Sequence, residues 1–187
     1  VALFADISRL RMPNYVVIAA GEASVDFNIT VQDNTAADGD HQVNLYADVA
    51  DSFNLLSIPG TRVEKTLLIT DNDGPTLSVT VDKNVIAEAA GASAAVGTVT
   101  RNTPATEDLV VYLSSTDTTE ATVPATVTIL AGHQSATFAI DAISDGVQDG
   151  TQNVTVVAAA AGFNSGSTGI QVSDRELPDL QVSEITL

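Results

Sequence analysis

Acidic side chains dominate the chemistry that this sequence offers. The 187 residues contain 24 Asp and Glu against 7 Lys and Arg, which gives a formal net charge of −17. Several acids stand in turn-like runs, such as Asp71-Asn72-Asp73-Gly74-Pro75, Asp145-Gly146 and Asp149-Gly150. Carboxylates that converge from several loops can hold calcium, which takes six to eight oxygen ligands. Asp, Asn and Gly also favour turns for backbone reasons alone, so a turn without metal is the competing interpretation.

Other chemistry has little support in the residues. The absence of Cys excludes disulfides, thiolate nucleophiles and Cys-based zinc sites. His41 and His133 lack a second His or Cys at metal-site spacing, and no Gly-x-Ser-x-Gly element marks a hydrolase. An aromatic content of 4% without Trp argues against a sugar-cleaving site. The negative charge disfavours nucleic acid, and no apolar run is long enough to span a membrane. We therefore expect a non-catalytic protein without membrane insertion.

The segments between the acidic turns read as β-strands. Apolar residues alternate with polar ones in 24–31, 76–82, 126–129, 134–141 and 153–156. Strands of this kind bury one face and expose the other, as in antiparallel sheets. Short strands separated by turns predict a sandwich or barrel. Its core in the second half of the chain is predicted to contain Val99, Val111, Ile129, Phe138, Ile140, Val154 and Val156, and we also interpret Phe27, Tyr112 and Phe163 as core residues.

An internal repeat organises the chain. An offset of 111 residues aligns Pro13 with Pro124, Gly21 with Gly132, Phe27 with Phe138 and Asp38-Gly39 with Asp149-Gly150. After a gap, residues 68–75 pair with 170–178. Self-similarity over such a period indicates repeated modules. We predict that 1–74 form the C-terminal part of a first unit, that 75–177 form a complete second unit, and that 178–187 form the first strand of a following module. The chain then reads as a segment of a longer protein.

The second unit resembles a known family in six segments: Glu88-Ala89-Ala90-Gly91, Gly97-Thr98-Val99-Thr100-Arg101, and the stretches 113–117, 121–129, 132–138 and 172–176. These are similar to Calx-β repeats, which are found in sodium–calcium exchangers, in a laminin-binding integrin subunit and in large bacterial surface proteins. The likeness is greatest to the bacterial surface type. It implies an all-β fold of tandem antiparallel immunoglobulin-like sandwiches with seven strands each, in an extracellular or cell-surface setting.

The same resemblance implies a calcium site at one tip of the second unit. Its ligands would correspond to Glu88, Asp145, Asp149 and Asp174, while the loop 116–120, which ends at Glu120, aligns only loosely. The acids are fewer than in strongly calcium-binding members. Arg175 also places a positive charge in the closing acidic run, where it would oppose a metal.

A denser set of acids stands in the first unit. Asp38, Asp71 and Asp73 are the predicted ligands there, at a corner between the two units, with Asp33, Asn34 and Asp40 nearby in the sequence. The segment that would supply the early Glu has no counterpart in 1–74. We weigh the turn interpretation above the metal one in both units, and calcium is thus an optional cofactor.

Three classes of function remain open. We favour a structural or adhesive repeat segment, such as a stalk or filament, stiffened by calcium where calcium binds. The alternatives are a calcium-binding regulatory module and an accessory domain of a secreted enzyme. The expected partners are neighbouring repeat modules, further copies of the chain in a homo-polymer, or a surface receptor. Strand donation from 178–187 to the incomplete first unit of another copy is one route to a polymer. We favour the simpler alternative, in which flanking chain completes that unit.

Overall fold

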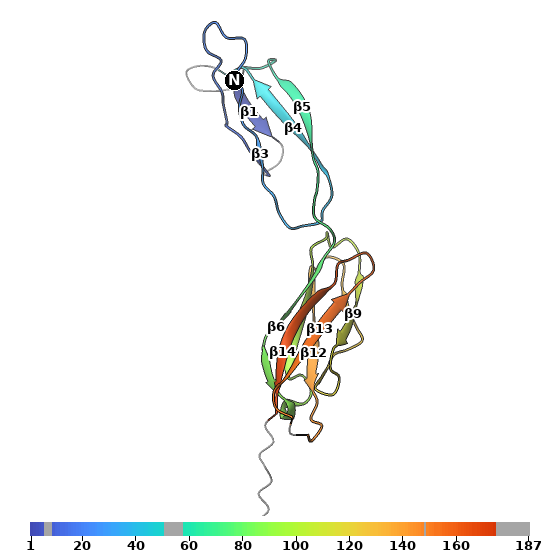
Figure 1. Ribbon diagram of the computed structural model, residues 1–187. Coiled ribbons are helices and arrows are strands. Elements are labelled where there is room, and N and C mark those ends of the chain that lie inside the picture. Colours follow the sequence, from blue (N-terminus) through green and yellow to red (C-terminus); the bar gives the residue numbers. More distant parts are fainter. Residues whose placement is uncertain (6–8, 51–57, 148, 175–187) are drawn as a thin grey trace, which may run out of the picture. The chain divides into compact units, whose positions relative to one another are not determined.

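The computed structural model describes residues 1–5, 9–50, 58–147 and 149–174 (Figure 1). The chain divides into two compact units, unit 1 (Val1–Asp73) and unit 2 (Gly74–Leu187). Regular structure in the described residues is β-strand, apart from one short 3₁₀ helix. No helix in this part of the chain is long and apolar enough to cross a membrane. The predicted strand in 178–187 and the closing residues Arg175 and Glu176 lie outside the described residues.

Unit 2 is a sandwich of two sheets. One sheet has the order β10-β12-β8-β6, formed by β6 (Leu77–Val81), β8 (Ala95–Arg101), β10 (Ala121–Thr122) and β12 (Ser135–Ala142). The other has the order β11-β9-β13-β14-β7, formed by β7 (Val85–Ala87), β9 (Leu109–Ser115), β11 (Thr126–Ile129), β13 (Gln152–Ala159) and β14 (Gly166–Ser173). The ladders are antiparallel except the one between β7 and β14, which is parallel. The prediction of an all-β antiparallel sandwich is confirmed.

Unit 2 has more strand elements than the seven expected, because two chain segments change sheets. β6 pairs with β8 in one sheet, and β7, which follows it directly, pairs with β14 in the other. In the same way β10 pairs with β12 and β11 pairs with β9. The first segment thus supplies an edge strand to each sheet, β6 and β7, and the second supplies the opposite edge strands, β10 and β11. Pairing of these strands leaves fewer unpaired backbone groups at the edges.

The core of unit 2 lies between the two sheets. All seven residues predicted for it are buried, with exposed fractions of 5% for Phe138 and at most 1% for the other six. The interpretation of Tyr112 as a core residue was wrong, since 63% of its surface is exposed. Val111 and Leu113 on either side of it are buried, so the alternation along β9 turns Tyr112 outward.

Unit 1 contains two smaller sheets. β1 (Ala2–Ala5), β4 (His41–Asp48) and β5 (Val63–Ile69) form one, in the order β1-β4-β5, and β2 (Leu10–Arg11) pairs with β3 (Thr30–Val31) in the other. The strand predicted over 24–31 was wrong except at its last two residues. Val25 and Phe27 are both 39% exposed. In unit 2 the equivalent strand β12 lies between β10 and β8, whereas β3 in the described part of unit 1 pairs only with β2, so residues 24–29 gain no ladder.

Candidate metal centre

The register of one ladder brings two predicted ligands to the same end of unit 2. Ala87 at the end of β7 is the partner of Ser173 at the end of β14. Because these strands are parallel, the chain leaves both at the same end of the sheet. The next residues are Glu88, which opens the 3₁₀ helix Glu88–Ala90, and Asp174.

The end of β12 connects two further loops to this place. The N–H of Ala142 donates to the carbonyl of Gly91, just after the 3₁₀ helix, over 2.9 Å. The N–H of Ile143 donates to the carbonyl of Glu120 over 2.8 Å. Glu120 directly precedes β10, whose first residue Ala121 pairs with Ala142. Backbone hydrogen bonds thus hold the Glu120 loop and the 3₁₀ helix against the same strand end.

Three carboxyl groups converge there. Glu88, Glu120 and Asp149 each place an oxygen so that these atoms lie within 4.8 Å of one another. We call these three residues the carboxylate triad. Glu88 and Glu120 are each only 2% exposed, whereas Asp149, in the loop between β12 and β13, is exposed. Two members of the triad, Glu88 and Glu120, are therefore buried, and the side of the triad formed by Asp149 is open to solvent.

The buried oxygens of the triad lack partners. Both carboxyl oxygens of Glu88 and the Oε2 of Glu120 are inaccessible and accept no hydrogen bond. A buried carboxylate without a partner is strongly unfavourable unless it takes up a proton or pairs with a cation. The geometry thus leaves two possibilities, a shared proton or a bound cation.

Electrostatics at the triad support this conclusion. Burial, followed by the charges of Asp149 and Glu88, raises the pKa of Glu120 from 4.5 to about 7. Burial and then the charges of Asp174, Asp145 and Asp149 raise the pKa of Glu88, and its contact with the Glu120 carboxyl partly offsets this rise. The negative charges of Glu88 and Asp149 thus make the ionisation of Glu120 harder, and a divalent cation would reverse that effect.

The structure brings the predicted ligands of unit 2 together to different degrees. Glu88 and Asp149 belong to the triad. Asp174 is half-buried beside Glu88, and Asp145 is exposed in the β12–β13 loop. The Oδ1 of Asp145 accepts the N–H of Val147 over 2.8 Å, as a turn residue does.

Glu120 was missing from the predicted set of ligands. It stands in the loop that aligned only loosely, where Asp117 accepts the N–H and hydroxyl of Thr119 over 3.0 and 2.6 Å. The local pattern of this turn does not mark Glu120 as a ligand. The burial of Glu120 depends on contacts with residues distant in sequence. The internal repeat held a usable signal, because the offset that aligns the acidic turns also aligns Glu120 with a basic residue, Arg9.

The predicted ligands of unit 1 form a different network. Asp38 accepts two hydrogen bonds from the guanidinium of Arg9, one over 3.3 Å between Nη1 and Oδ1 and a shorter one from Nη2. The Nε2 of His41 lies 3.2 Å from the Oδ1 of Asp38. The Asp71 carboxylate accepts the N–H groups of Gly39 over 2.7 Å and of Asp73 over 2.9 Å.

The pKa values of the three predicted ligands in unit 1 shift in opposite directions. The hydrogen bond from Arg9 lowers the pKa of Asp38, and the backbone N–H groups lower that of Asp71. Burial and the charges of Asp33 and Asp71 raise the pKa of Asp73. Among the described residues of unit 1, no three acids gather their oxygens as closely as the carboxylate triad does.

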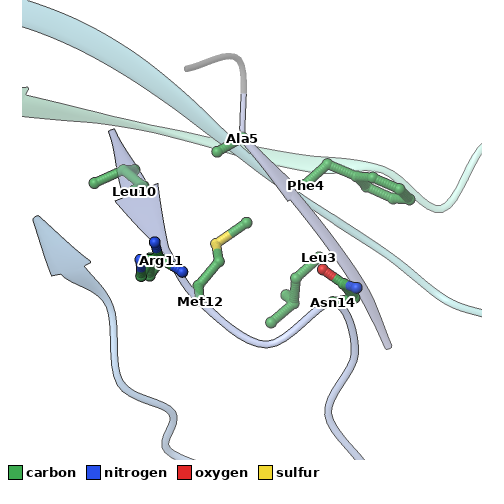
Figure 2. Close-up of a pocket in the computed structure, with 7 residues that line it drawn as sticks. All are labelled: Leu3, Phe4, Ala5, Leu10, Arg11, Met12 and Asn14. Carbon is green, nitrogen blue, oxygen red and sulfur yellow. The ribbon is translucent and has the colours of Figure 1, made fainter. Parts of the chain in front are cut away.

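A separate hollow of about 440 Å³ lies in unit 1 between β1 and β2 (Figure 2). Its lining consists of Leu3, Phe4, Ala5, Leu10, Arg11, Met12 and Asn14. None of these side chains is an acid, a His, a Ser or a Cys. The hollow therefore offers neither a general base nor a nucleophile.

Comparison with known proteins bears on the fold. No protein-family model matches the chain, and no curated protein matches it. Among sixteen solved chains that do match, the D00-D0 domain of intimin is 15% identical with a TM-score of 0.51 and covers 92% of this chain and 85% of its own.

Two other matches are weaker. A glycosyl hydrolase family 2 member from Bacteroides cellulosilyticus is 10% identical with a TM-score of 0.41, covering 88% of this chain and 21% of its own. Protocadherin gamma B7 extracellular cadherin domains 1–4 are 18% identical with a TM-score of 0.38, covering 80% and 36%. Scores below 0.5 carry no argument about this chain. The sheet topology and the intimin likeness together assign the chain to the all-β immunoglobulin-like sandwiches.

Proposed function

We propose that this chain is a non-catalytic structural or adhesive repeat segment of a bacterial extracellular or cell-surface protein, and that unit 2 holds calcium at the carboxylate triad. In this proposal 1–74 are the C-terminal part of a first Calx-β-like unit, 75–177 are a complete unit, and 178–187 are the first strand of a following module. The observation that carries the calcium site is the burial, beside Asp149, of three carboxyl oxygens without hydrogen-bond partners: both of Glu88 and the Oε2 of Glu120.

The donor set favours calcium over other metals. The triad offers carboxylate oxygens without His or Cys, which suits hard cations. Its ligands come from a helical turn and two loops, and calcium accepts such irregular geometry, whereas magnesium demands a near-ideal octahedron. Asp149 on the open side leaves room for water ligands, which would complete the coordination.

The setting of the triad also fits an extracellular protein. Three carboxylates with one exposed member resemble the weaker calcium sites of extracellular modules, whose dissociation constants are on the order of 10⁻⁴ to 10⁻³ M. Calcium at such a site would tie the loops before β8, β10 and β13 together. The functional result is a stiffer end of unit 2, as a structural segment requires.

Thermal unfolding in calcium and in chelator tests the proposal. Calcium at 100 times its dissociation constant should stabilise the folded chain by about 2.7 kcal/mol. Glu88→Gln and Glu120→Gln should each abolish this gain, because each removes a carboxylate from the triad. Glu107→Gln is the matched control: Glu107 is exposed and follows β8, whereas Glu88 precedes it, so the two stand at opposite ends of that strand. An unchanged wild-type melting temperature would refute the calcium site.

A further inference from the structure

The two units repeat the same strand register, not only the same residues. β2 pairs Leu10 with Val31, and β10 pairs Ala121 with Ala142, one repeat offset of 111 residues later on both strands. β4 (His41–Asp48) and β13 (Gln152–Ala159) are related by the same offset. Equivalent positions in the two units can therefore be assigned from the ladders.

The register makes the two acidic networks equivalent. Asp38 precedes β4 as Asp149 precedes β13. His41 pairs with Ile69 as Gln152 pairs with Val172, and Asp71 and Asp174 each follow two residues later.

One position differs in the sign of its charge. The residue before β2 is Arg9, and the residue before β10 is Glu120. In unit 1, the guanidinium of Arg9 donates two hydrogen bonds to the Asp38 carboxylate. In unit 2, the equivalent pair is Glu120 and Asp149, two acids whose oxygens lie within 4.8 Å. The first pair neutralises itself, and the second does not.

We propose that the residue before this strand decides whether a unit depends on a metal, and that the Arg9 guanidinium takes the place of the cation in unit 1. The chain then binds one divalent ion, in unit 2, and unit 1 carries its cation as a side chain. This inference rests on the proposed calcium site in unit 2.

The chemistry of the two cations makes the exchange reasonable. A guanidinium is always charged, so it supplies a permanent positive charge beside a carboxylate. Its two parallel N–H groups can also bind the carboxylate through two hydrogen bonds. Arg9 also feels the negative charge of Asp71, which raises its pKa further after the larger effect of Asp38. A metal in the same place would have to displace the guanidinium. In unit 2, both carboxyl oxygens of Glu88 and the Oε2 of Glu120 are buried without a hydrogen-bond partner.

Exchanging the charges tests the inference. Glu120→Arg should abolish calcium binding in titration calorimetry and raise the melting temperature in chelator above that of the wild type. Glu120→Lys serves as a second variant in case the longer fork does not fit. Glu107→Arg, with the same change of charge in an exposed loop, should do neither. If both Glu120 variants bind calcium like the wild type, or if neither melts higher in chelator, the inference is overturned.

The reciprocal change examines unit 1. Arg9→Glu should lower the melting temperature in chelator, and calcium should restore part of the loss by binding the introduced carboxylate together with Asp38 and Asp71. Lys65→Glu is the control, because it also replaces a positive charge by a negative one, at an exposed position of β5. An Arg9→Glu chain that melts like the wild type in chelator would contradict the inference.

The two proposals can fail separately. Absence of calcium binding by the wild type would overturn the calcium site alone. The melting temperatures in chelator would still decide whether position 120 accepts an internal cation, since that readout does not require metal.

Discussion

Phe138 lies directly opposite Gly97 in the ladder between β8 and β12, and its ring covers the place where a side chain at residue 97 would stand. A Cβ built at Gly97 would collide with three ring atoms of Phe138. The aromatic ring can thus reach the core of unit 2 because the facing strand has no side chain at this point. A side chain added at Gly97 would therefore disturb the packing of Phe138 in the core of unit 2.

Gly97→Ala should therefore destabilise unit 2. The added methyl forces the Phe138 ring from its position, and overpacking of this kind costs roughly 1–3 kcal/mol. Gly169→Ala in β14 is the matched control, because nothing lies within 4 Å of its added Cβ. Urea unfolding measures both. Equal stability of the Gly97→Ala chain and the wild type would show that the ring is not held over Gly97.

Phe138→Ala should be more damaging. Phe138 is 5% exposed in the core, and truncation of a large buried aromatic residue costs about 3–5 kcal/mol. Tyr112→Ala provides the contrast, since Tyr112 is 63% exposed and its loss should change the free energy of unfolding by less than about 1 kcal/mol. A loss below about 1 kcal/mol for Phe138→Ala would exclude the assigned core.

The raised pKa of Glu120 predicts a pH dependence in chelator. Between its ordinary value of 4.5 and the folded value of about 7, the folded state holds a proton that the unfolded state has released. Stability should therefore fall as the pH rises through this range. Glu120→Gln should flatten the slope, whereas Glu107→Gln should leave it as in the wild type. Unfolding by urea at a series of pH values measures the effect, and an unchanged slope in Glu120→Gln would contradict it.

Unit 1 should depend on the ion pair between Asp48 and Arg62. Asp48 is 3% exposed, and it accepts hydrogen bonds from the Nε and Nη2 of Arg62 over 3.1 and 2.9 Å. The guanidinium also lies 5.2 Å from the ring centre of Tyr46. Arg62→Ala should lower the melting temperature. Arg62→Lys keeps the positive charge but loses the bidentate hydrogen bonding, so its melting temperature should lie between those of Arg62→Ala and the wild type. Equal melting temperatures for Arg62→Ala and the wild type would refute this role.

The core of unit 2 could be predicted because its strands alternate strictly. Val154 and Val156 on β13, for example, follow the period of two and are both buried. The same pattern was misleading at Val25 and Phe27, since alternation describes a strand only where a neighbouring strand offers a ladder. The first unit's sequence carries the pattern without that partner among the described residues.

The candidate site could be predicted only in part. Glu88 and Asp149 followed from the family resemblance, and the ladder registers explain why they meet. Glu120 could not be identified from its own loop, because a backbone hydrogen bond from Ile143, at the end of β12, holds this residue in place. Contacts of this kind join residues that no local pattern connects.

A crystal structure of the chain soaked with calcium tests the central claim most directly. We expect an anomalous-scattering peak bounded by Glu88, Glu120 and Asp149, with carboxylate oxygens at about 2.3–2.6 Å from the ion. We expect no such peak between Arg9 and Asp38, where the guanidinium supplies the positive charge. A calcium-soaked crystal with no peak at the carboxylate triad would contradict the calcium site, and a peak at Asp38 and Asp71 would contradict the replacement of calcium by Arg9.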